Sequence, residues 1–318
     1  MKLKSVIYTV FLVGLLLTVL FSCQKKDNNE SNIQLPTLTT ERLGGITFTI
    51  AYGGGTITSD GGDSITTRGI CWSINKTPTI ADSKSIDITD PNHFGNYFNS
   101  HLNSLSANTT YCYRTYAVNK AGTGYGNVRM FVTDCDGNLY NVETIGTQVW
   151  MLENLKTTKY RNGDLIPNIS NATQWSNLIT GAYCFYNNNL SNEVFYGALY
   201  NWFSLNDKRN LAPTGWHVAS DTEWTTLINY LGGESVAALK LNNVGEIGFA
   251  QFGGLRNSDV SVNFTAIYNN SFWWSSTQEN TIQAWGIYLA SNSYNPSPAL
   301  IRNSHNMKYG LSVRCVKD

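Results

Sequence analysis

The chain opens with one long apolar run and then changes to short alternating segments. The basic start Met1-Lys2-Leu3-Lys4 is followed by the sixteen almost wholly apolar residues from Val6 to Phe21. A helix that spans a bilayer needs about 20 residues, and a basic segment before a short apolar one is typical of a secretory signal. We therefore expect residues 1–22 to be an export signal.

This signal ends in Leu20-Phe21-Ser22-Cys23, which resembles the lipobox cut by lipoprotein signal peptidase, although Phe21 is bulkier than the usual residue. The resemblance implies that Cys23 becomes a lipidated N-terminus, and such lipid chains hold a protein on a bilayer. An ordinary signal peptide with a chance cysteine, or an uncleaved anchor, is the alternative. Residues 24–35 are polar, so 23–35 is predicted to be a lipidated, flexible tether.

From residue 36 to 133, short β-branched and aromatic runs alternate with clusters of Gly, Asn, Asp and Ser. We expect strands at 46–50, 69–73 and 110–117, the last with a clear period of two. Gly53-Gly54-Gly55 and the 60–63 segment are predicted to be turns. About seven short strands in roughly 100 residues predict an all-β sandwich.

The second half, 134–318, mixes strand and helix signals and holds eight of the nine tryptophans. A hairpin is expected over 139–150. Ser220 and Glu223 have the spacing of a capping box, and the apolar spacing that follows predicts a helix that ends at Gly232-Gly233. Further helices are expected around 196–205 and 235–241. This half is therefore predicted to be an α+β domain.

The balance of charged residues limits which kinds of molecule the protein is expected to bind. Charged residues make up 14% of the chain and aromatic residues 13%. Loss of the two signal lysines leaves 20 basic and 22 acidic residues, a balance that does not indicate nucleic acid as a partner. A surface of amides, hydroxyls and tyrosines is typical of binding surfaces, although most aromatic side chains are expected to be core.

The first half resembles a known module. Thr67-Arg68-Gly69-Ile70-Cys71-Trp72-Ser73, the 105–111 segment and the 117–126 segment are similar to the fibronectin type III-like modules of Bacteroides-group envelope proteins. The resemblance covers about 95 residues and implies that Cys71 and Cys112 lie on neighbouring strands, within range of a disulfide. Two buried free thiols are the alternative.

The second half closely resembles the Fibrobacter succinogenes major paralogous domain. The matching phrases occur in family order and include GTQVWMLENLKTTKY at 146–160, LYNW at 199–202, PTGWHV at 213–218, WWSST at 273–277 and SVRCV at 312–316. The resemblance implies a C-type-lectin-like, formylglycine-generating-enzyme-like fold over 134–318. Two departures are Ala212, where the family usually has cysteine, and Ala219, where it usually has proline.

In that fold class the two chain ends usually run side by side, so the resemblance implies a Cys135–Cys315 disulfide. Cys184 would then be the free thiol. Relatives that generate formylglycine use a reactive cysteine pair, and the cysteines here do not have that arrangement. Oxidase activity is therefore not expected.

Few sequence motifs indicate a metal or cofactor site. The Asp134–Asn138 segment starts like a calcium loop, but Ile145 occupies the position that needs a bidentate glutamate, and a β-turn is the better interpretation. Asn295-Pro296 faintly resembles the Asn-Pro of calcium-dependent lectins, without a following acid. Four scattered histidines and no CxxC predict no metal, and we expect no cofactor.

Trp273 and Trp274 are the strongest candidates for ligand binding, with Asn295 beside them as a weaker one. Adjacent residues of a strand point to opposite faces, so one indole is expected to be core and the other could stack on a sugar ring; packing of both is the alternative. Trp216 is expected to be a core anchor. His217 and Glu223 could form an acid–base pair, but no nucleophile or ligand set accompanies them, and packing is the better interpretation.

The sequence favours a non-catalytic envelope lipoprotein whose lectin-like domain binds an extracellular glycan or protein, with the sandwich as a spacer. A structural or assembly component of the envelope is the first alternative, and an extracellular carbohydrate-active enzyme the second. No motif of a hydrolase, zinc protease or P-loop occurs. Gln24 is not the aspartate that retains lipoproteins at the inner membrane, so the expected location is the outer membrane, with surface exposure an open alternative.

Overall fold

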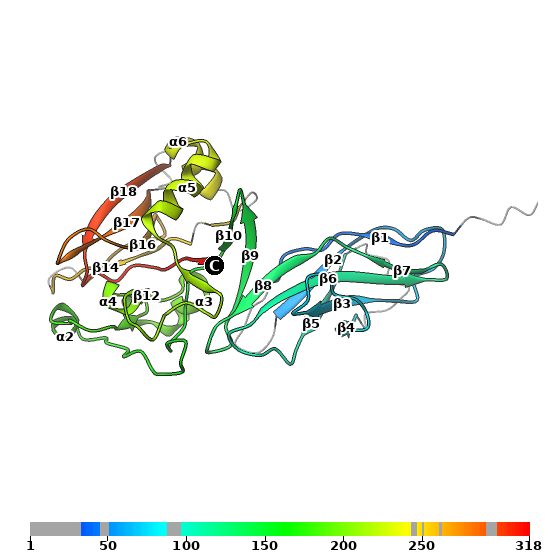
Figure 1. Ribbon diagram of the computed structural model, residues 1–318, viewed down its shortest axis with the longest axis horizontal. Coiled ribbons are helices and arrows are strands. Elements are labelled where there is room, and N and C mark those ends of the chain that lie inside the picture. Colours follow the sequence, from blue (N-terminus) through cyan, green and yellow to red (C-terminus); the bar gives the residue numbers. More distant parts are fainter. Residues whose placement is uncertain are drawn as a thin grey trace, which may run out of the picture.

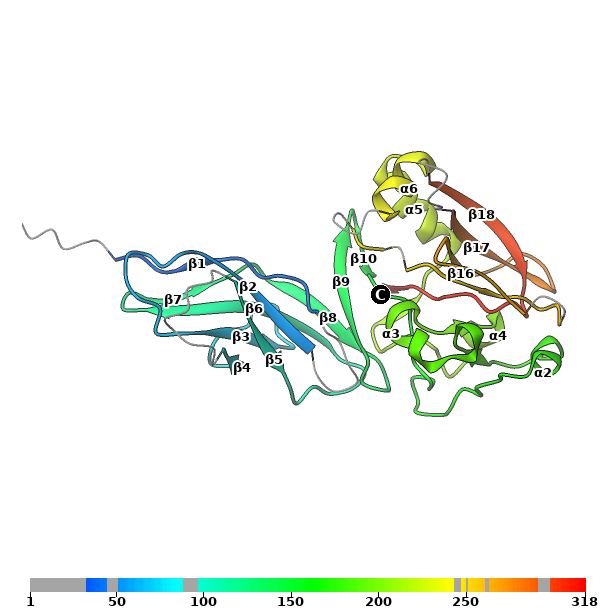
Figure 2. The ribbon, with the colours of Figure 1, turned by 180° about the vertical axis from the view of Figure 1, so that it is seen from behind.

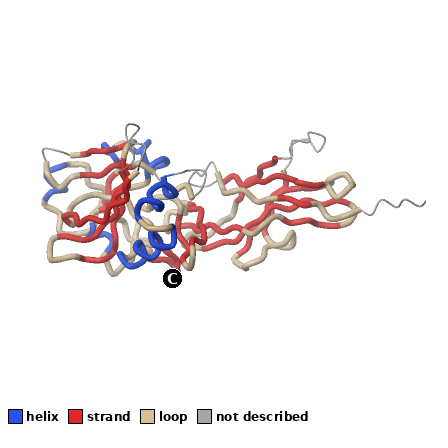
Figure 3. The backbone as a smooth tube through the Cα atoms, turned by 90° about the horizontal axis from the view of Figure 1, so that it is seen from above, coloured by secondary structure: helices blue, strands red, loops and turns tan. Residues whose placement is uncertain are grey.

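The computed structural model describes residues 33–44, 51–87, 97–242, 247–249, 251–260, 263–290 and 298–318. These residues form two lobes placed end to end, a slender all-β lobe and a broader lobe (Figure 1). The helices are confined to the broader lobe (Figure 3). Strands prevail and build several separate sheets. None of the helices in these ranges is long and apolar enough to cross a membrane. The expected signal and Cys23 lie outside the described residues.

Two facing sheets make up the slender lobe. A three-stranded sheet has the order β1-β2-β5. The opposing sheet contains β4, β3, β6 and β8 in that order, with β7 also paired to β6. The strands are β1 (Thr37–Leu38), β2 (Ala51–Ser59), β3 (Thr67–Ser73), β4 (Ser83–Ile86), β5 (Tyr97–Leu102), β6 (Thr110–Asn119), β7 (Gly122–Tyr125) and β8 (Arg129–Thr133). Trp72, Tyr113 and Phe131 lie in the core between the sheets.

The strands expected at 69–73 and 110–117 are confirmed as parts of β3 and β6, while the one expected at 46–50 lies outside the described residues. The turn predicted at Gly53-Gly54-Gly55 is wrong, because these glycines lie inside β2. A Cβ on Gly54 would collide with the carbonyl of Phe98 on the neighbouring strand. The glycines therefore allow close backbone approach rather than a change of direction. The turn at 60–63 is confirmed, with positive φ at Gly61 and Gly62.

One sheet runs through both lobes. The sheet that contains β8 continues through β9 (Leu139–Ile145), β10 (Gln148–Met151), β19 (Cys315–Lys317) and β13 (Trp216–Val218). The hairpin of β9 and β10 confirms the hairpin expected over 139–150. Strand β8 pairs with β6 on one side and with β9 on the other. As Figure 2 shows, β9 stands between the lobes, so backbone hydrogen bonds join them into one unit.

The broader lobe has a five-stranded sheet of its own. Its order is β15-β14-β16-β17-β18, formed by β14 (Gly253–Arg256), β15 (Phe264–Ile267), β16 (Asn270–Gln278), β17 (Gln283–Ala290) and β18 (Ala299–Asn306). A small sheet pairs β11 (Tyr183–Cys184) with β12 (Leu199–Tyr200). Helices α5 (Asp221–Leu231) and α6 (Glu234–Asn242) pack on the large sheet, α5 through Trp224 and Leu227 and α6 through Ala238 and Leu241.

The helices expected over 221–231 and 235–241 are confirmed as α5 and α6, and both halves of the Ser220–Glu223 capping box form. The helix expected over 196–205 is only partly right. Helix α3 (Glu193–Tyr196) ends at Gly197, whose φ is +73°, and a new helix, α4 (Trp202–Leu205), begins after Asn201 caps it. The other short helical segments are α2 (Ala172–Ser176), η1 (Tyr186–Asn188) and η2 (Leu190–Asn192).

All five cysteines within the described residues are free thiols, so neither expected disulfide forms. Cys71 lies opposite Arg114, whereas Cys112 lies opposite Ser73. Such diagonal neighbours on adjacent strands are about 7–8 Å apart, beyond the ~4 Å Cβ separation of a disulfide. Cys315 is fully buried in β19, opposite Val218, and Cys135 is half-buried in the loop between β8 and β9.

These free thiols predict a simple labelling result. Denatured protein treated with iodoacetamide should gain five modified cysteines from the described residues, whether or not it was first reduced. Peptide mass spectrometry would locate each label. A Cys71–Cys112 or Cys135–Cys315 peptide pair that separates only after reduction would contradict the structure.

Candidate functional site

Neither of the two adjacent tryptophans reaches the surface. Trp273 and Trp274 are both fully buried, and they lie in different core clusters on opposite faces of the sheet, as the strand pattern predicts. The Trp273 indole N–H donates to Oδ1 of Asn154 at 2.8 Å, and that of Trp274 donates to the carbonyl of Tyr200 at 2.8 Å. The expectation of an exposed indole here is wrong, because α5 packs on one face of the strand and α4 lies against it as well. Asn295 lies outside the described residues.

The tryptophan that is not buried is Trp285, on β17. The guanidinium of Arg302 lies over its ring, 3.3 Å from the centroid. Two hydrogen bonds from Arg302 to the carboxylate of Asp221, at 2.6 and 2.9 Å, hold the guanidinium there. This indole face is therefore already occupied by a side chain of the chain itself.

Exposed aromatic rings gather instead beside α3. Phe195 is 66% exposed and Tyr268 is 69% exposed. The half-buried Tyr196 lies between them, with ring centroids 6.2 Å from Phe195 and 6.0 Å from Tyr268. We call these three residues the aromatic ridge. Tyr268 has a φ of +70°, a conformation that costs a side-chain-bearing residue free energy and that often marks functional positions.

A cleft of about 420 Å³ lies next to the ridge, where the two lobes meet. Its lining includes Gly44 of the slender lobe, Leu139 of β9 and Phe195 of the ridge. The polar side chains in it are Glu153, Asn154, Lys156, Glu193 and Gln251. We call it the acidic cleft.

Glu193 is the unusual group in the acidic cleft. The residue is only 4% exposed, and its carboxylate makes no hydrogen bond or ion pair within the described part of the chain. Burial raises its pKa, and the nearby charge of Lys156 opposes that rise. Gly197 helps to set this geometry, because a Cβ there would collide with Asn154. The carboxylate oxygens of Glu193 are not among the atoms sealed from solvent, so they can accept hydrogen bonds from a ligand in the cleft.

Glu153 is the second carboxylate of the acidic cleft, and it already has partners. It accepts hydrogen bonds from the backbone N–H of Asn141 at 2.8 Å and from the Asn141 side-chain amide at 2.9 Å. Burial nevertheless raises its pKa. The buried Arg314 is a nearby positive charge, which ties Glu153 to the core of the broader lobe.

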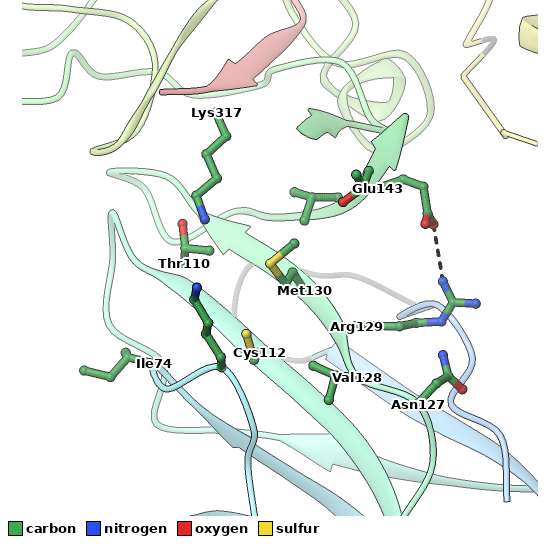
Figure 4. A pocket seen from close by; sticks show the side chains of 12 residues that line it. Ile74, Thr110, Cys112, Asn127, Val128, Arg129, Met130, Glu143 and Lys317 are labelled. Carbon is green, nitrogen blue, oxygen red and sulfur yellow. Dashed lines mark hydrogen bonds and ion pairs between the residues drawn. The ribbon is translucent and has the colours of Figure 1, made fainter. Parts of the chain in front are cut away.

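A second and larger cleft, of about 700 Å³, lies at the same junction (Figure 4). Residues of β6, β8 and β9 line it, and Lys76 and Lys317 contribute the ammonium groups. We call it the basic cleft. Arg129 also lines it but is paired with Glu143 at 3.3 Å.

The Asp134–Asn138 segment forms the turn that the sequence favours. Oδ1 of Asp134 accepts the backbone N–H groups of Asp136 and Asn138, each at 2.9 Å, while Oδ2 accepts the hydroxyl of Tyr140 at 2.6 Å. These bonds use the Asp134 carboxylate inside the protein. Within the described ranges, no three His, Cys, Asp or Glu side chains gather as a metal site would require.

His217 and Glu223 do meet, at 2.7 Å between Nε2 and Oε1. Nδ1 of the same ring lies 2.6 Å from the carboxylate of Asp318, and Glu223 also receives the Ser220 hydroxyl and backbone N–H of the capping box. Burial alone would lower the pKa of His217, but the bonds to Asp318 and Glu223 outweigh it and the pKa is raised. The trio links the C-terminus to α5, which is a packing role.

The His217 contacts predict a pH dependence of stability. Because the folded-state pKa is raised, the stabilisation is fully present below about pH 6.5 and is lost as the pH rises through the folded-state value. Since the ring is half-exposed, the effect should be less than about 1 kcal/mol. Chemical unfolding between pH 5.5 and 8.5 should show a larger fall in the wild-type protein than in His217→Gln. Equal slopes would contradict the ion-pair assignment.

Glu193 predicts an unusual gain in stability. Glu193→Gln removes a carboxylate whose ionised form is disfavoured by partial burial, so the free energy of unfolding at pH 7 should stay level or rise by less than about 1 kcal/mol. Glu143→Gln is the matched control, because it breaks the pairs with Arg42 and Arg129 and should not stabilise. Urea unfolding measures both. A clear loss of stability in Glu193→Gln would show that the carboxylate has a partner.

Sequence reasoning missed Glu193, Lys156 and Phe195. No local pattern marks the one-turn helix that carries Glu193 and Phe195, and the cleft exists only because distant segments converge on it. The unusual composition of the Asn187–Tyr196 segment, rich in amides with three exposed apolar residues, is a signal that could have drawn attention to this region.

Known proteins match the chain to very different degrees. No curated protein matches the chain. A solved structure described as "Myokine structure" is 13% identical, with a TM-score of 0.22, over 32% of this chain and 97% of that chain. The twitchin kinase region from C. elegans is 11% identical, with a TM-score of 0.25, over 65% of this chain, and the match spans only 35% of that structure's length. TM-scores this low do not indicate a shared fold.

The sequence model of the Fibrobacter succinogenes major domain matches residues 142–317. The match covers more than half of the chain and begins inside β9, a few residues after the boundary expected at 134. Its range includes every tryptophan of the broader lobe, the acidic-cleft residues Glu153, Lys156 and Glu193, and the capping box of α5. The chain belongs to the Fibrobacter succinogenes major domain family.

Proposed function

We propose that this protein is a non-catalytic, lipid-anchored protein of the cell envelope that binds an extracellular glycan through the acidic cleft of its broader lobe. The observation that carries the proposal is the position of an exposed ring, Phe195, at a cleft that holds Glu193, a largely covered residue whose carboxylate has no partner among the described residues. The slender lobe is a spacer between the anchor and this site.

A sugar needs both kinds of surface that the cleft offers. The C–H face of a pyranose packs on an aromatic ring, and Phe195 and Tyr268 are open to solvent. Its hydroxyl groups donate and accept hydrogen bonds, and Glu193, Lys156 and Gln251 provide acceptors and donors within one cleft. A few polar groups in an otherwise apolar cleft are typical of small-molecule sites, and the volume suits one or two sugar residues.

The proposed anchor and module types come from the sequence. The apolar leader and Cys23 support lipid attachment, and Gln24 favours the outer membrane. A three-stranded sheet facing a sheet that includes β4, β3, β6 and β8 supports a fibronectin type III-like module, which we propose for 36–133. For 134–318 we propose a C-type-lectin-like fold, supported by the short helices beside mostly antiparallel sheets.

Binding to a glycan array followed by calorimetry with the full-length chain in detergent tests the proposal. Phe195→Ala and Tyr268→Ala should each weaken binding of the selected glycan about 3- to 10-fold, the range expected for one aromatic contact. Glu193→Gln should weaken it further without loss of stability. Tyr97→Ala, which removes an exposed tyrosine of the slender lobe, is the matched control and should bind normally.

Failure of the array would leave the structural alternative. If no glycan binds while all variants remain folded, the glycan proposal is wrong and a role in envelope assembly becomes the better interpretation. Binding that persists unchanged in Phe195→Ala and Glu193→Gln would place the glycan elsewhere on the protein.

One observation favours a second candidate function, hydrolysis of the glycan. Glu153 and Glu193 line the same cleft and both have raised pKa values, and glycosidases use a pair of carboxyl groups. The bonds from Asn141 that already occupy Glu153 argue against a catalytic role. Incubation of the bound glycan with the protein separates the two functions: new reducing ends that Glu153→Gln abolishes would establish an enzyme, and intact glycan supports binding alone.

A further inference from the structure

The basic cleft has a chemistry that the glycan proposal does not use. It lies where the two lobes meet, and in Figure 4 side chains from both lobes point into it. Thr110 and Cys112 come from β6, Met130 comes from β8, and Lys317 comes from β19 at the other end of the chain. The cleft therefore exists only when the shared sheet is formed.

Two ammonium groups in this cleft have no counterion. Lys76 and Lys317 make no ion pair or hydrogen bond within the described residues, whereas Arg129 beside them is neutralised by Glu143. Burial raises the pKa of Cys112 on the cleft floor, and the charges of Lys317 and Lys76 both oppose that rise. Both lysines line this one cleft, and they come from different lobes.

A neutral donor lies next to the lysines. The hydroxyl oxygen of Thr110 accepts the indole N–H of Trp216 at 3.0 Å, which leaves the hydroxyl hydrogen free to be donated. In Figure 4 the Lys317 side chain points toward Thr110. Glu143 and Asn127 also line the cleft, but Glu143 is paired with Arg42 and Arg129. The two ammonium groups and the hydroxyl therefore remain suited to a group with negatively charged oxygen atoms.

Apolar side chains form a further part of the lining of this cleft. Ile74 is 71% exposed and Val128 is 40% exposed at its edges, and the half-buried Met130 forms part of its floor. Large exposed aliphatic side chains around a charged site favour a ligand that has an apolar body as well as an anionic group.

We propose that the basic cleft binds an anionic group, a carboxylate or a phosphate, carried on an apolar body, with Lys76 and Lys317 holding the charge and Ile74, Val128 and Met130 contacting the body. This site is separate from the acidic cleft, and the proposal does not depend on glycan binding. Joining of the two lobes is what completes it.

Methyl NMR of the full-length chain in detergent, labelled with [¹³C-methyl]methionine, tests this proposal. The probes are acetate, hexanoate and inorganic phosphate. The Met130 methyl signal should shift on titration, while those of the core residues Met151 and Met307, which are 0% and 4% exposed, should not. Hexanoate should bind more tightly than acetate because of its apolar chain, and phosphate tests the charge alone.

Variants then assign the charge. Lys76→Gln and Lys317→Gln should each weaken binding about 5- to 10-fold, the usual effect of losing one charged hydrogen bond, and the double variant should abolish it. Lys120→Gln removes an exposed lysine at the far turn of the slender lobe and should bind like the wild-type chain. A Met130 signal that no anion shifts, or a shift that survives in the double variant, would overturn the proposal. The outcome does not depend on whether Glu193→Gln alters glycan binding.

Discussion

Backbone pairing between β8 and β9 is the interaction on which the whole arrangement depends. Four residues of β8, from Met130 to Thr133, pair in register with Val142 to Leu139 of β9. Strand β8 closes the sandwich while β9 opens the sheet of the broader lobe, so the same ladder completes both. A flexible linker would let two domains move independently, but here a change in their relative orientation would have to break paired strands. Both clefts lie at this junction, so their shapes depend on how the two lobes are placed.

Buried charge helps to define the broader lobe. The guanidinium of Arg314 is completely buried, lies 4.3 Å from the ring centroid of Phe249 and donates to the carbonyls of Met151 and Phe249. Burial lowers its pKa to about 9, and the carboxylate of Glu153 opposes that change. Arg256 is buried in a similar way, stacked 4.2 Å from the ring centroid of Trp175 and bonded to the carbonyls of Ile169 and Ser170. These arginines satisfy the carbonyl of Met151 at the end of β10 and carbonyls of irregular segments.

The sequence predicted the elements with strong local signals and failed where tertiary packing decides. The capping box and the apolar spacing of α5 are local, and both formed as expected. Three consecutive glycines suggested a turn, yet Gly54 is required by the approach of a strand more than forty residues away. The helix expected over 196–205 was interrupted by Gly197, whose conformation depends on contact with Asn154. Likewise, Trp273 is buried because helix α5 packs against its strand, and a strand pattern alone cannot place that helix. No local pattern indicates Glu193 either. Its position in a cleft results from the meeting of two lobes.

The shared sheet also determines how the molecule would respond to a pull. Strand β1 and the broader lobe lie at opposite ends of the long axis (Figure 1), so a force that pulls the lobes apart passes through the β8–β9 ladder. Strand β9 stands across the long axis (Figures 1 and 2), so such a force would act across the ladder, along hydrogen bonds that lie perpendicular to the strands. The ladder would then open pair by pair, and the two lobes would separate while each keeps most of its own core.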